Sequence, residues 1–61
     1  MPPHRFMVLR RVDRAKELLV NAEIPVSEVA TRAGFNSVTQ LTKAFRRTVG
    51  TTPSAFRREI S

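Results

Sequence analysis

The stretch VATRAGFNSVTQLTKAF, residues 29–45, decides the fold. Its apolar residues recur at helical spacing on both sides of Gly34. Gly34 directly follows Ala33, at the position where a residue in the left-handed conformation commonly ends a helix. Ser37 and Gln40 form an S-x-x-Q capping box, which satisfies two backbone NH groups at the start of a helix. The stretch therefore predicts two helices joined by a glycine turn.

The helix before the turn is short and has small apolar residues on one face. Pro25 precedes it, and its apolar positions recur at i, i+3, i+4 and i+7, namely Val26, Val29, Ala30 and Ala33. The helix after the turn is expected over 37–49, and Gly50 is expected to end it. Its buried face is expected to hold Leu41, Phe45 and Val49. Residues 25–49 thus have the pattern of a helix-turn-helix, with Phe35 covering the turn.

Helical spacing continues on both flanks of this unit. A first helix is expected over 5–20, where one stripe contains Val8, Val12, Ala15 and Leu19. A last helix is expected over 53–59, with Thr52 as its cap, Pro53 at its first position and Phe56 as its anchor. The sequence has no strand pattern. It therefore predicts an all-α fold of about four helices in a single domain over 1–61.

Two apolar residues of the first helix lie outside its stripe. Leu18 and Met7 lie roughly 120–140° away from it at about 100° per residue. A helix that packs on one side needs less apolar circumference than this. The sequence therefore predicts an exposed apolar face around Leu18 and Met7.

The charge of the chain indicates a polyanionic partner. Eleven Lys and Arg residues oppose five Asp and Glu residues among 61, which gives a net charge of +6. Such a field attracts nucleic acid first and an anionic membrane surface second. A basic domain without such a partner is the alternative. No apolar run approaches the length of about 20 residues that spans a bilayer, and the start, MPPHRF, lacks the pattern of a secretion signal.

An enzymatic function has almost no support in the sequence. A domain this small is not expected to enclose a deep catalytic pocket, and the absence of cysteine excludes thiolate chemistry. His4 is the only histidine and has no nearby carboxylate to orient it. Asp13 and Glu17 lie one helical turn apart among cations, which they are expected to offset. We predict no catalytic residue, no metal site and no cofactor.

The outward face of helix 37–49 carries polar and basic side chains. With Phe45 as the inward direction, Lys43 lies at about 160°, Arg47 at about 200° and Gln40 at about 220°. Thr39 and Arg46 lie at about 120° and 100°. Lysine and arginine reach phosphates or guanine edges, glutamine can pair with adenine, and threonine can take either role. A glycine turn followed by such a helix is typical of a DNA-binding helix-turn-helix.

Alternatives stay open for single residues of this face. Val38 lies at about 20°, near the buried face, yet in the first turn that points into the groove in this motif. Partial burial is expected, and contact with a thymine methyl is the alternative. The Gln40 side chain has two uses, at the helix cap or on a base. For the outward face of helix 37–49 as a whole, the alternative is a solvated surface without a ligand. The predicted DNA-binding residues are Ser37, Val38, Thr39, Gln40, Lys43, Arg46 and Arg47.

These residues resemble the C-terminal DNA-binding region of the AraC/XylS transcription regulators. PHRFMVLRRVDRAKELL, residues 3–19, is similar to that family's linker helix with the proline that precedes it. IPVSEVATRAGFNSVTQLTKAFRRTVGTTPSAFRR, residues 24–58, is similar to its second helix-turn-helix and closing helix. The spacing of A-x-x-x-G-F, L-T-K-A-F-R-R and G-T-T-P-S-A-F-R-R is highly specific, and the match covers nearly the whole chain.

The resemblance implies a sequence-specific regulator of bacterial transcription, in the cytoplasm at the nucleoid, that binds double-stranded DNA. The family's domain has two helix-turn-helix units joined by the linker helix. Its base-reading positions fall on Val38, Thr39, Gln40 and Lys43 here, with Arg46 and Arg47 as flanking phosphate or structural positions. Val38 and Thr39 are shorter than the side chains that the family often has there, so we expect a modest sequence preference.

The resemblance also implies what accompanies this unit. The chain is expected to be half of an AraC-type domain, without the first helix-turn-helix and without an effector-binding or dimerisation domain. The missing unit or another protein chain is then a candidate partner, and no small-molecule effector site or membrane partner is expected. One alternative function is a protein-interaction fragment that pairs through the apolar face of the first helix. Another is a membrane-surface peptide, because the first helix is basic and amphipathic.

Overall fold

The computed structural model describes residues 3–60 of the chain, with side chains from residue 6 onward. It contains four helices, α1 (Pro3–Leu19), α2 (Val26–Ala33), α3 (Val38–Val49) and α4 (Pro53–Ile60). Residues 3–60 contain no strand, so the prediction of an all-α fold with four helices is confirmed. The side chain of His4, for which no catalytic role was predicted, lies outside the described part.

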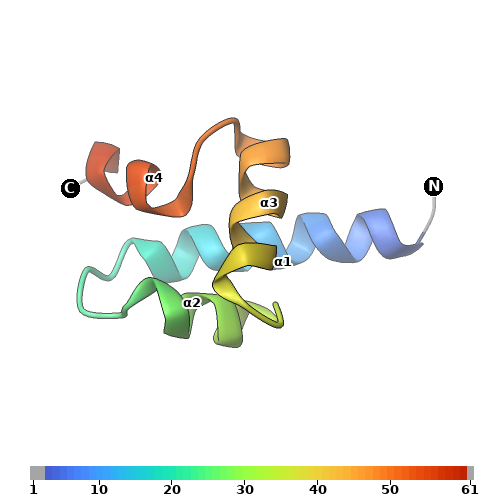
Figure 1. Cartoon of the computed structure of the whole chain (residues 1–61), viewed down its shortest axis with the longest axis horizontal. Coiled ribbons are helices and arrows are strands. Elements are labelled where there is room, and N and C mark those ends of the chain that lie inside the picture. The colour runs from blue at the N-terminus through green and yellow to red at the C-terminus, as the bar shows by residue number, and fades with distance from the viewer. Residues whose placement is uncertain (1–2, 61) are drawn as a thin grey trace.

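The long helix α1 is the base on which the other helices pack. It runs along the molecule and contacts each of the three others (Figure 1). The helix begins at Pro3 rather than at residue 5 and ends at Leu19, one residue earlier than expected. Within residues 3–60, no helix combines the length and apolar character that crossing a bilayer requires.

The core is formed by the apolar faces of three helices. Its buried residues are Val12, Ala15, Leu18, Leu19, Val29, Ala30, Ala33, Leu41 and Phe45. The prediction that Leu18 is part of an exposed face is wrong, because only 7% of its surface is exposed. Since α1 contacts three helices rather than one, a wide arc of its circumference is buried. Met7 remains half exposed, at 50%.

The turn between α2 and α3 has the expected glycine cap. Gly34 has φ 95° and ψ 17°, in the left-handed region. Its NH donates to the Thr31 carbonyl at 3.2 Å, and the Phe35 NH donates to the Ala30 carbonyl at 2.9 Å. This pair of bonds is a Schellman motif, which satisfies carbonyls at the end of α2. Phe35 is half-buried against the core, as expected for a residue that covers the turn.

The last helix is fastened to the rest of the molecule at two places. The rings of Phe45 and Phe56 are edge to face, with centroids 5.3 Å apart. The guanidinium of Arg57 donates to the Leu19 carbonyl at 3.0 Å and to the Asn21 carbonyl at 3.2 Å. Leu19 is the last residue of α1, where helices leave carbonyls unpaired, and Asn21 lies in the turn that follows. Arg57 therefore ties α4 to the end of α1.

Candidate nucleic-acid interface

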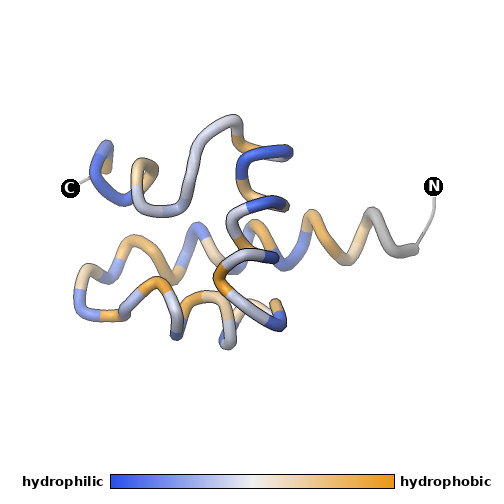
Figure 2. The backbone as a smooth tube through the Cα atoms, viewed as in Figure 1, coloured by the Kyte–Doolittle hydropathy of each residue, from blue (hydrophilic) through white to orange (hydrophobic). Residues whose placement is uncertain are grey.

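The buried residues of α3 fix the orientation of this helix. Leu41 and Phe45 are both 0% exposed and point into the core. The small side chains of α2 at Val29, Ala30 and Ala33 are buried in the same core. Figure 2 shows hydrophilic and apolar residues alternating along α3, as expected for a helix with one buried face. The side of α3 opposite Leu41 and Phe45 must therefore face solvent.

The outward face of α3 carries the residues that were predicted from the helical angle. The side chains on it are exposed, and they are Thr39, Gln40, Lys43, Arg46 and Arg47. Val38 lies at the margin, with 39% of its surface exposed. Most of its side chain is thus covered, while the remainder is open to solvent beside Thr39. The fold brings all seven predicted residues onto α3 or its N-cap.

Ser37 caps α3, as its sequence pattern predicts. Its hydroxyl accepts the backbone NH of Gln40 at 3.2 Å. This is one half of a capping box. For the Gln40 side chain itself, the structure records no hydrogen bond within residues 6–60. The amide of Gln40 is therefore available to a ligand, whereas the Ser37 hydroxyl is used within the chain.

The charge of the α3 face is not neutralised by the described chain. Lys43, Arg46 and Arg47 make no ion pair within residues 6–60. The ion pairs recorded there lie on other helices, Arg14–Glu17 on α1 at 3.1 Å and Arg32–Glu28 on α2 at 2.6 Å. The first turn of α3 has no acidic residue either. An anion that approaches this face meets three cations without an internal competitor.

Two residues near α3 were not singled out by the sequence. Arg57 ties α4, which packs on α3, to α1. Arg11 of α1 lies against Gly34 in the turn before α3, where a Cβ on the glycine would be 3.3 Å from its Nε atom. Both contacts join residues that are distant in the sequence, so no local pattern indicates them. The excess of basic residues was the only related signal.

Comparison with known proteins agrees with this geometry. A family described as "Helix-turn-helix domain" matches residues 1–59. The chain is 37% identical over 54 residues to the "Probable transcriptional regulator LumQ" of Photobacterium leiognathi. It is 37% identical over 58 residues to the "Uncharacterized HTH-type transcriptional regulator YdiP" of Escherichia coli. It is 36% identical over 55 residues to the "HTH-type transcriptional regulator ExsA" of Pseudomonas aeruginosa.

These matches cover most of this chain but a small part of each relative. They span 88%, 95% and 90% of the chain, and 22%, 19% and 20% of LumQ, YdiP and ExsA. The chain thus spans about a fifth of the length of the curated relatives it matches. No solved structure gives a significant match.

The fold and these matches define an AraC-type helix-turn-helix, the DNA-binding domain of bacterial transcription regulators. The chain belongs to this family, which is one of regulators rather than enzymes. The resemblance stated from the sequence is therefore confirmed. The roles of single residues on α3 stay a prediction.

Proposed function

We propose that the chain binds double-stranded DNA by docking α3 in the major groove, as the second helix-turn-helix of an AraC-type regulator. Thr39, Gln40 and Lys43 would read base edges near the start of α3. Val38 would contact a thymine methyl with the exposed part of its side chain. Ser37 would hold the first turn of α3 in place.

Phosphates are the proposed partners of the arginines on α3. Arg46 and Arg47 lie in the last turn of the helix and would contact the backbone on either side of the groove. Phosphate contacts position a protein on DNA and supply most of its affinity, whereas base contacts give the specificity. We therefore expect weak binding with a modest sequence preference.

One observation carries this proposal. The exposed side chains of α3 include three cations, a threonine and a glutamine, while Leu41 and Phe45 on the opposite face are fully buried. A solvated surface helix of a soluble protein usually mixes both signs of charge. The described outward face of α3 has no acid, which suits a polyanion.

The test is a selection of bound sequences from random duplex DNA at two salt concentrations. If about three or four cations touch phosphates, log affinity falls against log salt with a slope near −3. Lys43→Ala is expected to relax the preference at one or two base positions. Arg47→Ala is expected to weaken binding to all sequences alike and to reduce the salt slope by about 1.

A charge-matched control separates local contacts from net charge. Arg10 is exposed and lies two residues before the buried Val12, about 200° around α1 and so away from the core. Arg10→Ala removes the same charge as Arg47→Ala, but from α1 rather than from α3. Equal and sequence-blind losses from Lys43→Ala, Arg47→Ala and Arg10→Ala would contradict the assigned roles.

A protein-interaction function is the second candidate, and it now depends on different residues. Leu18 is buried and contributes nothing to it, whereas Phe6 and Met7 are 52% and 50% exposed. These two side chains lie near the start of α1. A membrane-surface role has less support, since the main apolar stripe of α1 is in the core. Formation of a complex that Met7→Ser abolishes, with no retention of DNA, would favour the second candidate.

A further inference from the structure

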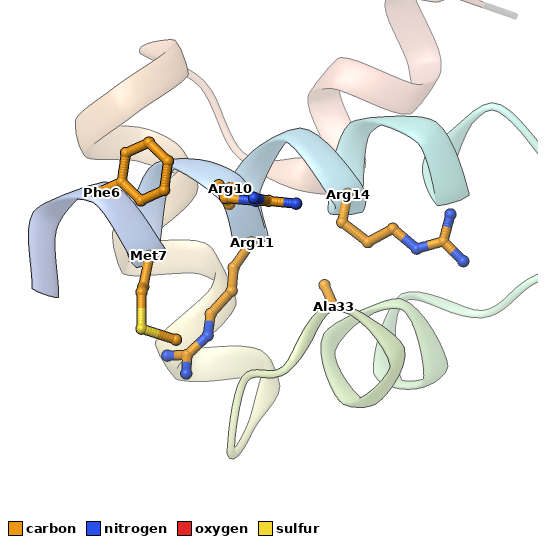
Figure 3. Close-up of a pocket in the computed structure, with 6 residues that line it drawn as sticks. All are labelled: Phe6, Met7, Arg10, Arg11, Arg14 and Ala33. Carbon is orange, nitrogen blue, oxygen red and sulfur yellow. The ribbon is translucent and has the colours of Figure 1, made fainter. Parts of the chain in front are cut away.

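Arg11 on α1 lies across the turn of the helix-turn-helix. A Cβ placed on Gly34 would be 3.3 Å from its Nε atom and 3.5 Å from its Cδ atom. The stem of the arginine is therefore packed on the glycine, and its side chain is half-buried. Figure 3 shows Arg11 reaching from α1 towards the chain that follows Ala33.

Arg11 differs from the other arginines of its surroundings. An open pocket of about 420 Å³ is lined by Phe6, Met7, Arg10, Arg11, Arg14 and Ala33 (Figure 3). Arg14 is paired with Glu17 at 3.1 Å, and the guanidinium of Arg10 lies 6.0 Å from the ring centre of Phe6. Within residues 6–60, Arg11 makes no hydrogen bond or ion pair, and no acid lines the pocket.

A half-buried cation without a partner is unfavourable unless an anion or water compensates it. Partial burial removes hydration from the charge, and a nearby negative group restores the lost interaction. The position of Arg11 indicates where that group comes from. Gly34 precedes Ser37, the N-cap of α3, by three residues, so their α-carbons are at most about 11 Å apart. Arg11 is therefore close to the end of α3 that the proposed function places against DNA.

We infer that Arg11 binds a backbone phosphate of the DNA on which α3 docks, and thereby holds the α2–α3 turn against the duplex. This inference rests on the proposed function and adds a contact from α1 to those of α3. A phosphate suits the site because arginine presents several NH donors to its oxygens. Such a contact is blind to sequence and fixes the register of the recognition helix on the groove.

The experiment compares Arg11→Met, Arg11→Lys and Arg10→Met in the 61-residue chain, with duplex DNA at several salt concentrations. Methionine keeps an unbranched stem over Gly34 and removes the charge. We expect Arg11→Met to lower affinity about tenfold at low salt for all sequences, and to reduce the salt slope by about 0.9. Arg11→Lys keeps the charge and should retain the wild-type slope. Arg10 lines the same pocket, but its guanidinium lies over the ring of Phe6, so Arg10→Met should change the slope far less although its loss of net charge is identical.

Each contrary outcome is distinct. If the wild-type chain does not bind DNA, the proposed function fails and the inference with it. If the wild type binds and Arg11→Met lowers the thermal midpoint but leaves the slope unchanged, Arg11 merely packs on the turn and the inference is overturned. Equal slope changes in Arg10→Met and Arg11→Met would show that the effect is not specific to Arg11, which also overturns the inference. If inorganic phosphate raises the thermal midpoint of the chain as much as DNA does, the site binds a small anion, and the inference is overturned.

Discussion

Two turns flank α3, and their glycines have nearly the same φ angle but different surroundings. Gly34 and Gly50 have φ values of 95° and 93°, and each ends a helix in the left-handed region. A hydroxyl side chain soon follows each glycine and caps the next helix, Ser37 for α3 and Thr52 for α4. A Cβ on Gly34 would meet Arg11, whereas a Cβ on Gly50 would meet nothing within 4 Å.

The difference indicates that the two turns hold their helices in different ways. At Gly34 the stem of Arg11 lies beside the turn, within contact distance of an added Cβ, although the glycine itself stays exposed. At Gly50 the turn is open, and α4 is held by what comes after it. The ring contact between Phe45 and Phe56 and the hydrogen bonds of Arg57 fasten α4. The α2–α3 turn thus has a contact of its own from α1, in addition to the buried residues that orient α3, whereas the position of α4 depends on contacts made beyond its turn.

The largest expected effect comes from adding a Cβ to each glycine. An L-residue in the left-handed region costs about 1–2 kcal/mol. We expect Gly50→Ala to destabilise the chain by about 1 kcal/mol and Gly34→Ala by about 2 kcal/mol, because the stem of Arg11 must also move. Urea unfolding of both variants measures the difference, provided that the two m-values agree.

Repeating both glycine substitutions in an Arg11→Ala variant shows whether the contact with Arg11 causes the difference in stability between Gly34→Ala and Gly50→Ala. In Arg11→Ala, the space over Gly34 is open, so Gly34→Ala and Gly50→Ala should become equally destabilising. If Gly34→Ala stays more destabilising than Gly50→Ala by the same amount in the Arg11→Ala variant, the contact with Arg11 does not distinguish the two turns, because the strain then comes from the backbone alone. Gly50→Ala should be additive with Arg11→Ala, since Arg11 is not among the atoms within 4 Å of a Cβ at Gly50.

The features that could be predicted from the sequence are those with local signals. The glycine caps, the Ser37 and Thr52 caps and the apolar stripes each extend over a few residues, so the helices and the buried face of α3 followed from them. The outward face of α3 followed in turn from the position of Phe45. Its exposure agrees with the expectation, while its contacts with DNA stay a prediction.

The features that could not be predicted join distant parts of the chain. Leu18 was expected on an exposed face because the sequence does not indicate how many helices α1 contacts. The partner carbonyl of Arg57 at Leu19 is 38 residues away in the sequence. Arg11 likewise meets Gly34 only through the tertiary fold. An arginine in a basic chain has no local pattern that distinguishes a tertiary contact from a solvated charge.

The next effect concerns α4, which follows the turn at Gly50 and is held by Arg57. We expect Arg57→Met to destabilise the chain by about 1.5 kcal/mol, because hydrogen bonds from a charged donor to two carbonyls are lost. Hydrogen exchange should show faster opening of α4 than of α2 and α3. Arg57→Lys should recover only part of the loss, since an ammonium group lacks the planar fork of donors. Faster exchange throughout α2 would mean that the two turns are not independent.

The smallest effect distinguishes the two caps by function rather than by stability. Ser37→Ala and Thr52→Ala each remove a side-chain acceptor from a backbone NH, at 3.2 Å and 3.1 Å, and each should cost about 1 kcal/mol. Thermal unfolding should therefore show similar shifts, about 4–8 °C for a domain of this size. Only Ser37→Ala frays the turn of α3 that carries Val38, Thr39 and Gln40. Its DNA affinity, measured well below the midpoint, should fall more than that of Thr52→Ala, and equal affinities would show that the first turn of α3 is ordered by the DNA rather than by its cap.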